Sequence, residues 1–570
     1  MKFSFLTQKS PLSFPVDVSP TWLLALDCPN LTSESIAWRD DRLVIFHAEP
    51  VLSPNRRFAI VGDIWLNNVK ELSHKHQLNS PLQPLSIVAN LWEKFGVDCL
   101  TELQGIFALA IWDRQQQKLW LGRDRVGGKT LYHTNNGSTH WIAPRLKTLA
   151  PYHSKEIDIV AMRDYLCCAF VPGERTLWQQ VRELRPGMYL RLPEESQPQP
   201  YWQPKEDIQN ADKSIEWHGE KLRSLLNQIV QESLPNNEPV GAYLSGGLDS
   251  SCITALAAKF HDRPVHTYSI HFGPDCPNEL EFSSLVAEHC QTQHHILEIT
   301  TQQMWDLLPI TMAHLDDPIG DPLTVPNYLL GKLAAQDVDV ILNGEGGDPC
   351  FGGPKNKPML LNSLYGTAGT QADELTTYLT SFKKCFAELP QLFQPDIWQK
   401  VQNAPSVFDP DLNSDADYLN RLMLLNIKFK GADHILTKVN NLTRATGVEG
   451  RSPLFDQRIV EMSLQIPPAY KLSGADEKAV LKQAVADILP ESIITRQKSG
   501  MMVPVQRWFR QVWQREAKGL LLSRQAAIAP YLNQALICNW LNYRGDTWSR
   551  YGVKLWLLVS LELWLQVNQK

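Results

Sequence analysis

Hydrophobic positions in the first 200 residues come in short runs that are separated by turn residues. Runs such as RLVIFHAEP, RFAIVGDIWL and IFALAIWD have the length of strands, and polar segments such as DRQQQK and HTNNGST fit hairpin loops. The pattern predicts a β-rich N-terminal domain over residues 1–200. A stretch rich in Pro, Gln and Glu at 190–214 is typical of a loop, and we place an interdomain linker at 201–215.

The pattern changes after this linker. EWHGEKLRSLLNQIVQESL has helical periodicity, and VGAYLSGG, VHTYSIHF and VDVILNGEGGD then alternate with helical segments. Strands that alternate with helices predict a parallel sheet covered by helices, and the chain from about residue 355 onward reads as mostly helical. We therefore expect an α/β C-terminal domain over residues 216–570.

Composition narrows the classes of function. The 570 residues carry a net charge of −6, with 43% hydrophobic and 20% charged residues, and no basic block marks a nucleic-acid footprint. None of the ten cysteines forms a C-x-x-C pair. No stretch approaches the roughly 18 apolar residues of a transmembrane helix. We expect a cytoplasmic protein without a nucleic-acid or membrane partner.

The segment Ser245–Ser251, SGGLDSS, stands where the first parallel strand ends and a helix begins. Backbone N–H groups at such a turn attract an anion, although a plain strand-to-helix turn with a cap is the alternative reading. The spacing excludes a Walker A loop, a dinucleotide fingerprint and a nucleophile elbow. The string instead matches the pyrophosphate loop of ATP pyrophosphatases. A second glycine turn, Gly344–Asp348, also follows a strand, so Asp249 and Asp348 could share one Mg²⁺.

Several motifs then follow in one order along the chain. They are YLSGGLDSS, YSIHF, LDDPIGDP, GEGGDPCFGG, GVEGRSPLFD, KAVLKQAV and RQKSGMMVPVQRWF. In this order they resemble the asparagine synthetase family over nearly the whole length. Residues 103–133 are similar to a glutamine amidotransferase domain of the N-terminal-nucleophile type. The resemblance implies a layered β-rich Ntn-hydrolase-like domain followed by an α/β ATP-pyrophosphatase domain with helical additions.

The resemblance also implies residue roles, with ATP and Mg²⁺ as cofactors. The Mg²⁺ ligands would be Asp249 and Asp348. The pyrophosphate cradle would be Ser245, Gly246, Gly247, Ser250 and Ser251. Contacts to adenosine would come from Leu244, Ile270 and Gly344. Lys498 would stabilise charge as the amide forms, Glu345 would serve acyl transfer, and Arg451 would lie near the carboxylate substrate. Arg496, next but one to Lys498, can also face phosphate or adenylate oxygens.

The N-terminal half departs from the family pattern. It should begin Met-Cys-Gly, with the cysteine as the nucleophile that cleaves glutamine, but residue 2 is Lys2. In AIVGDIWLNN, Val61 replaces the Asn that supplies an oxyanion donor. Loss of one such donor typically lowers the rate by about 10²–10³. We therefore expect no hydrolysis of glutamine and a structural or docking role for this half.

The predicted reaction adenylates a carboxylate and passes it to an amine. One hypothesis is closure of an amide within a peptide or small molecule, as in lasso-peptide cyclases and β-lactam synthetases. A second is ammonia-dependent synthesis of asparagine from aspartate, and a third is a non-catalytic regulatory relative. Lys2 and Val61, which stand in place of the cysteine and of the oxyanion Asn, favour the first, and Arg451 favours the second. A homodimer or an association with peptide-processing proteins would fit this interpretation.

Overall fold

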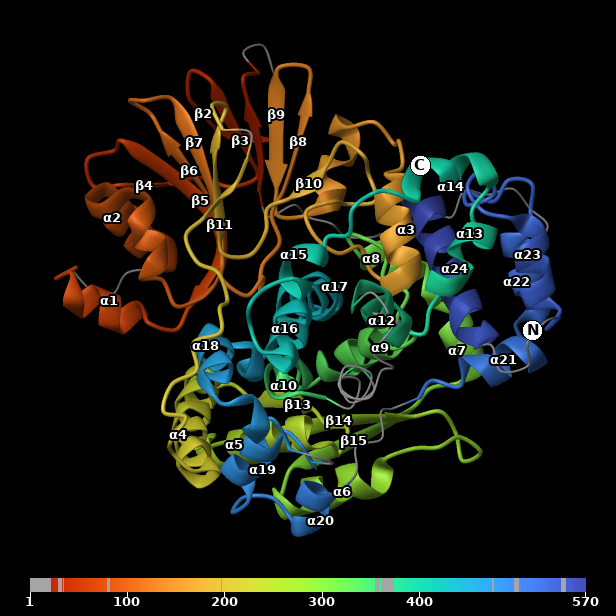
Figure 1. Cartoon of the computed structure of the whole chain (residues 1–570). Coiled ribbons are helices and arrows are strands. Elements are labelled where there is room, and N and C mark those ends of the chain that lie inside the picture. The colour runs from red at the N-terminus through yellow and green to blue at the C-terminus, as the bar shows by residue number, and fades with distance from the viewer. Residues whose placement is uncertain are drawn as a thin grey trace.

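The computed structural model describes residues 22–28, 33, 35–78, 83–195, 197–353, 359, 374–473, 476–496, 502–544 and 550–569. Figure 1 shows a β-rich half in red and orange beside a parallel sheet in yellow and green, with further helices around them. Residues 2 and 498 lie outside the described ranges, so the predictions made for Lys2 and Lys498 have no structural counterpart here.

Two six-stranded antiparallel sheets form the N-terminal half. The first has the order β10-β8-β9-β1-β3-β2, with the bounds Arg182–Glu183, Tyr132–Asn136, Thr139–Ala143, Leu23–Leu26, Leu43–Phe46 and Ile36–Arg39. The second has the order β12-β11-β7-β6-β5-β4, with the bounds Gln199–Pro200, Met188–Leu192, Lys118–Arg123, Gly105–Asp113, Phe58–Leu66 and Val51–Leu52. The sheets pack face to face, and helices α2 (Pro84–Phe95) and α3 (Ile159–Cys168) cover the outer faces. The predicted layered domain is confirmed.

Strand β6 shows why this sequence makes a sandwich. Phe107, Leu109 and Ile111 pack under α2, whereas Ala108, Ala110 and Trp112 pack between the sheets. Successive side chains of a strand point to opposite faces, so a run that is hydrophobic throughout needs cover on both sides. The run IFALAIWD therefore becomes a central strand of the sandwich.

A five-stranded parallel sheet organises the C-terminal half, as the alternation of strands and helices predicts. Its order is β15-β14-β13-β16-β17, with the bounds Gln293–Glu298, Val265–His271, Val240–Tyr243, Val340–Leu342 and Glu449–Arg451. Helices α4 (Ile215–Ser233) and α5 (Leu248–Phe260) pack on one face, and α8 (Leu308–His314) and α9 (Thr324–Ala334) pack on the other. The strand order changes direction between β13 and β16. Ligands of open α/β sheets bind at the carboxyl ends of the strands at such a switch point.

The remaining described helices surround these sheets. They are α1 (Val69–Lys75), α6 (Leu280–His289), α7 (Thr301–Asp306), α10 (Gly347–Phe351), α12 (Glu374–Ser381), α13 (Leu389–Leu392), α14 (Pro395–Val401), α15 (Asp409–Leu412), α16 (Tyr418–Leu425), α17 (Thr437–Thr446), α18 (Gln457–Gln465), α19 (Ala479–Val485), α20 (Glu491–Thr495), α21 (Val505–Gln511), α22 (Gln514–Leu521), α23 (Gln534–Leu541) and α24 (Tyr551–Asn568). A π-helix, Asn426–Leu436, joins α16 to α17 without a break.

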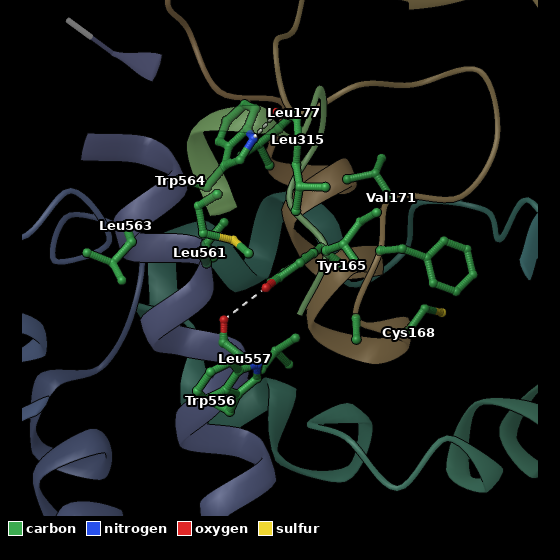
Figure 2. Close-up of a cluster of buried hydrophobic side chains, with 14 of the residues drawn as sticks. Tyr165, Cys168, Val171, Leu177, Leu315, Trp556, Leu557, Leu561, Leu563 and Trp564 are labelled. Atoms are coloured by element: carbon green, nitrogen blue, oxygen red, sulfur yellow. Dashed lines mark hydrogen bonds between the residues drawn. The ribbon is translucent and has the colours of Figure 1, made fainter. Parts of the chain in front are cut away.

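Helix α3 of the N-terminal half packs directly against α24, the last helix of the chain. The hydroxyl of Tyr165 donates a hydrogen bond of 2.9 Å to the carbonyl of Leu557 (Figure 2). The ring of Trp564 on α24 lies 5.3 Å, centroid to centroid, from the ring of Trp178 in the N-terminal half. The two halves therefore share one hydrophobic core. Although α24 is largely buried and apolar, no helix within the described ranges is long and apolar enough to cross a membrane.

Candidate active site at the carboxyl edge of the parallel sheet

The first glycine turn links β13 to α5. Gly246 has φ +74°, and a Cβ atom there would lie 2.6 Å from the backbone nitrogen of Ser283 on α6. The hydroxyl of Ser250 accepts the backbone N–H of Ser245 at 3.2 Å and lies 3.0 Å from the hydroxyl of Ser245. A close approach to α6 and a pair of hydroxyls thus hold the turn compact at the start of a helix.

Helix α5 begins at Leu248, directly after the turn. Its first N–H groups and its dipole favour an anion at this end. The predicted cradle residues Ser245, Gly246, Gly247, Ser250 and Ser251 therefore lie together around one helix N-terminus. Leu244 and Ile270 are buried at the ends of neighbouring strands β13 and β14, where the amide of Leu244 donates to the carbonyl of Tyr268 at 2.9 Å.

The second glycine turn leaves β16 and presses against the first. A Cβ atom on Gly344 would lie 2.5 Å from the nitrogen of Ser250, and one on Gly347 would lie 2.1 Å from Oδ1 of Asp249. The side chain of Asn343 shapes the turn, because it accepts the amide of Glu345 at 3.0 Å. Only residues without a side chain allow the two turns to approach so closely.

Asp249 and Asp348 meet at the ammonium group of Lys478. Nζ of Lys478 lies 2.6 Å from Oδ1 of Asp348 and also bonds Oδ2 of Asp249. The lysine is 2% exposed and has φ +55° just before α19 begins. One compact positive charge thus holds two carboxylates from different turns. Two hard oxygen donors around one point are the donor set that suits Mg²⁺, so these residues fit the predicted ion.

Sequence reasoning missed Lys478, although it is the first residue of KAVLKQAV. A lysine at the start of a short helix has no hydrophobic pattern that marks it as buried. Only the structure shows that Lys478 is the shared counter-ion of two carboxylates.

Arg496 braces the glycine turn. Its Nη1 donates to the carbonyl of Gly246 at 2.9 Å, its Nη2 pairs with Glu279, and its guanidinium lies 4.0 Å from the ring centroid of Phe282. These contacts join the turn to the start of α6, and a role of Arg496 towards phosphate oxygens stays a prediction.

A second charged group adjoins Glu345. Lys438 on α17 is buried and lies 2.7 Å from Oδ2 of Asp321, which is also 3.3 Å from Nε2 of His434. Burial lowers the pKa of Lys438, but Asp321 and Glu345 outweigh burial and raise it. Lys438 therefore remains a cation beside the predicted acyl-transfer glutamate. The sequence predicts a role for neither residue, although Asp321 ends the acidic part of the motif LDDPIGDP.

Two cavities flank these groups. One of about 430 Å³ adjoins the site, and its lining is Asp348, Gly353, Met359, Tyr378, Ser381, Phe382, Asn426 and Lys430. The other, of about 650 Å³, lies between the two halves, with Trp65 and Gly105 on one side and Arg451 and Ser452 on the other.

Arg451 is directed to the cavity between the halves rather than to the aspartate pair. Its Nε donates to Glu449 at 2.9 Å, and its Nη1 donates to the carbonyl of Ser233 at 2.8 Å. The guanidinium lies 5.4 Å from the ring centroid of Trp65. A role near the carboxylate substrate stays a prediction for this residue.

Two buried residues of the N-terminal half bear on glutamine chemistry. Val61 on β5 is 2% exposed and packs in the core between the two sheets. Burial raises the pKa of the Cys99 thiol, which disfavours the thiolate form that a nucleophile needs.

Comparison with known proteins identifies both halves. The asparagine synthase family matches residues 221–566, and a glutamine amidotransferase domain matches residues 31–202. The chain is 26% identical over 453 residues to asparagine synthetase [glutamine-hydrolyzing] 1 of Bacillus subtilis, covering 72% of this chain and 70% of the relative. It is 24% identical over 477 residues to asparagine synthetase B [glutamine-hydrolyzing] of Escherichia coli, covering 79% and 71%. A putative asparagine synthetase of Methanocaldococcus jannaschii is 30% identical over 345 residues, covering 57% and 62%.

Proposed function

Because the chain belongs to the asparagine synthase family, which implies an ATP-dependent ligase, we propose that it adenylates a carboxylate and joins it to an amine without hydrolysing glutamine. The observation that carries the proposal is the meeting of Asp249 and Asp348 at Lys478 beside the glycine turn. The place of this group at the switch point of the parallel sheet supports it further.

The first step would form an acyl-adenylate. The β and γ phosphates of ATP would rest on the turn at the start of α5, where Ser245 and Ser250 present hydroxyls. A carboxylate oxygen of the substrate attacks the α phosphorus, the bond to the bridging oxygen breaks, and pyrophosphate leaves. Mg²⁺, held by Asp249 and Asp348, would neutralise charge on the phosphates. Lys478 keeps the two carboxylates together before the nucleotide arrives.

The second step would form the amide. The amine nitrogen attacks the acyl carbon, AMP leaves, and the amine proton passes to a base. Glu345 is the proposed base, since it lies on the second turn, close enough to Lys438 for the two charges to interact. We propose that Lys498 stabilises the negative charge that develops as AMP departs.

Val61 and Lys2 support an amine that does not come from glutamine. We propose that the amine belongs to the substrate itself, as in lasso-peptide cyclases, and that the 430 Å³ cavity beside Asp348 takes the carboxylate part. The alternative is synthesis of asparagine from aspartate and ammonia, which the names of the relatives favour. Either reaction would run in the cytoplasm without a nucleic-acid or membrane partner. The protein would be compatible with a homodimer or with peptide-processing partner proteins.

Release of pyrophosphate from ATP and Mg²⁺ tests the proposal. The full-length protein is assayed with aspartate and ammonium, with aspartate and glutamine, and with peptides that carry an Asp or Glu side chain and a free N-terminus. Release with a peptide, together with loss of mass corresponding to one water, supports cyclisation. Asparagine formed from ammonium but not from glutamine supports the alternative.

Two variants make this assay specific. Asp249→Asn removes one proposed ligand and is expected to abolish release, whereas Asp262→Asn changes an exposed aspartate after α5 and is expected to leave it unchanged. Failure of every carboxylate to elicit pyrophosphate would overturn the ligase proposal in favour of a regulatory relative. Glutamate formed from glutamine would overturn its glutamine-independent part.

A further inference from the structure

Two histidines and an aspartate gather at the edge of the parallel sheet that is opposite the proposed ATP site. His266 is near the start of β14, His295 is on the edge strand β15, and Asp337 is in the turn between α9 and β16. The register places His295 beside Tyr268, so the side chains of His266, Tyr268 and His295 share one face of the sheet. Within the described part of the chain, this is the one group of three such side chains with metal-ligand spacing.

The distances between the three donor atoms resemble those of a metal site. Nδ1 of His266 lies 3.1 Å from Nε2 of His295. Oδ2 of Asp337 lies 4.0 Å from the first nitrogen and 3.8 Å from the second. Bonds of about 2.0–2.2 Å to a tetrahedral Zn²⁺ would set such atoms about 3.3–3.5 Å apart. Shifts of a few tenths of an ångström would therefore bring all three onto one ion.

Tyr268 supports the carboxylate and one imidazole. Its hydroxyl donates to Oδ2 of Asp337 at 3.1 Å, and its ring stacks on His295 with 4.9 Å between the centroids. The ring passes over Gly241, where a Cβ atom would lie 3.0 Å from it. Partners of this kind orient metal ligands, and their loss weakens metal affinity by about 10–100-fold.

The contact between the two imidazole rings also suits a cation, because it brings two ring nitrogens to one point. Without a cation, one ring donates its N–H to the other, and a bound ion would displace that proton.

We propose that His266, His295 and Asp337 bind a late first-row divalent cation, for which Zn²⁺ is the best match. Their side chains are 14%, 31% and 30% exposed, so an ion can enter and a water can complete the coordination. The ion would tie the edge strand β15 to β14 and to the turn before β16. This role is structural and is separate from the proposed ATP chemistry at the other edge.

Titration of the full-length protein with Zn²⁺ against a chromophoric chelator tests the site. One equivalent of Zn²⁺ is expected to bind the wild type and to raise its melting temperature. His295→Ala and Asp337→Asn are expected to lose both effects, and Tyr268→Phe is expected to weaken binding by about 10–100-fold. His294→Ala is the matched control, because His294 is the neighbouring residue of β15 and its ring bonds Thr267 on the opposite face. It should bind one equivalent.

Co²⁺ distinguishes this site from the cysteines. The Co²⁺-loaded protein is expected to absorb visible light but to lack a thiolate charge-transfer band. The presence of that band would assign the ion to a cysteine thiolate and overturn the proposal. Equal binding by the wild type, His295→Ala and Asp337→Asn would overturn it as well, as would the absence of stoichiometric binding. Circular dichroism of each variant without Zn²⁺ shows that the comparison is made between folded proteins.

Discussion

The substitution Gly347→Ala tests whether the position of Asp249 controls nucleotide chemistry. The new Cβ atom would lie 2.1 Å from Oδ1 and 2.3 Å from Cγ of Asp249. Ordinary contacts begin at 3.4 Å, so the carboxylate must retreat by about 1.3 Å from its place beside Lys478. Gly347 does not have a positive φ, so the backbone itself accepts alanine.

The displacement sets the size of the expected effect. A misplacement of about 1 Å in a catalytic arrangement lowers the rate by about 100-fold, and we expect pyrophosphate release to fall at least that far. Loss of a charge-assisted contact of about 1.5–3 kcal/mol would weaken binding of ATP with Mg²⁺ by about 10–150-fold. The fold should persist, because the aspartate can rotate away.

Two measurements follow from this estimate. Calorimetry with ATP and Mg²⁺ needs no acceptor, and pyrophosphate release uses the substrate pair that is active with the wild type. Gly519→Ala is the matched control, since no atom lies within 4 Å of a Cβ at this position of α22. Alanine there favours the helix by about 1 kcal/mol and should leave both measurements unchanged. If Gly347→Ala matched the wild type within twofold, the site would not depend on Asp249.

Three further outcomes are expected. Lys478→Met leaves two carboxylates without their cation, which destabilises by about 3 kcal/mol, the lower end for a broken buried pair because the side chain of Asp348 is 34% exposed. Thermal melting should show the loss of stability. Mg²⁺ should raise the melting temperature of the variant more than that of the wild type, and an equal rise would contradict a Mg²⁺ site shared by Asp249 and Asp348. Burial alone would raise the pKa of Asp63, but Lys129 and Arg444 lower it below the ordinary 3.8. The stability that the ionised Asp63 contributes is therefore present above pH 3.8 and is lost as the pH falls through the lower folded pKa. The difference in melting temperature between the wild type and Asp63→Asn should shrink below about pH 4. A difference that stays constant with pH would refute this prediction. Val61→Asn restores a donor but no nucleophile, so glutamate release from glutamine should stay at background in both proteins, and any release by the wild type would contradict the proposal.

The hydrophobic pattern predicts the architecture well, because the strands of each sheet can be recognised within a short stretch of sequence. IFALAIWD is apolar at every position but the last, so it needs cover on both faces. Alternation of strands and helices after residue 216 limits the topology to a parallel sheet. Once strands are parallel, turns that follow neighbouring strands meet at one edge. The structure accordingly brings Asp249 and Asp348 to a single ammonium group.

Contacts between distant segments could not be predicted in this way. Lys478 is 130 residues beyond Asp348, and no periodicity marks it as buried. The position of Arg496 close to Lys498 indicates that it can face phosphate oxygens, and the sequence carries no sign of its contacts with the carbonyl of Gly246 and the carboxylate of Glu279. Packing of α3 against α24 unites residues almost 400 positions apart. One amino-acid sequence carries no signal for such pairs.

These long-range contacts give the N-terminal half a structural role. Arg145 of the N-terminal half holds the fully buried Asp316 with Nε at 2.7 Å, and Arg185 holds the 1%-exposed Asp433 with Nη1 at 2.6 Å. Removal of the N-terminal half would take away both arginines and open the two aspartates to water, on the segments that carry Asp321, His434 and Lys438. The same removal would expose α24 where Tyr165 now binds it. We therefore expect the synthetase half to depend on the N-terminal sandwich for the positions of these aspartates, whether or not the sandwich hydrolyses glutamine.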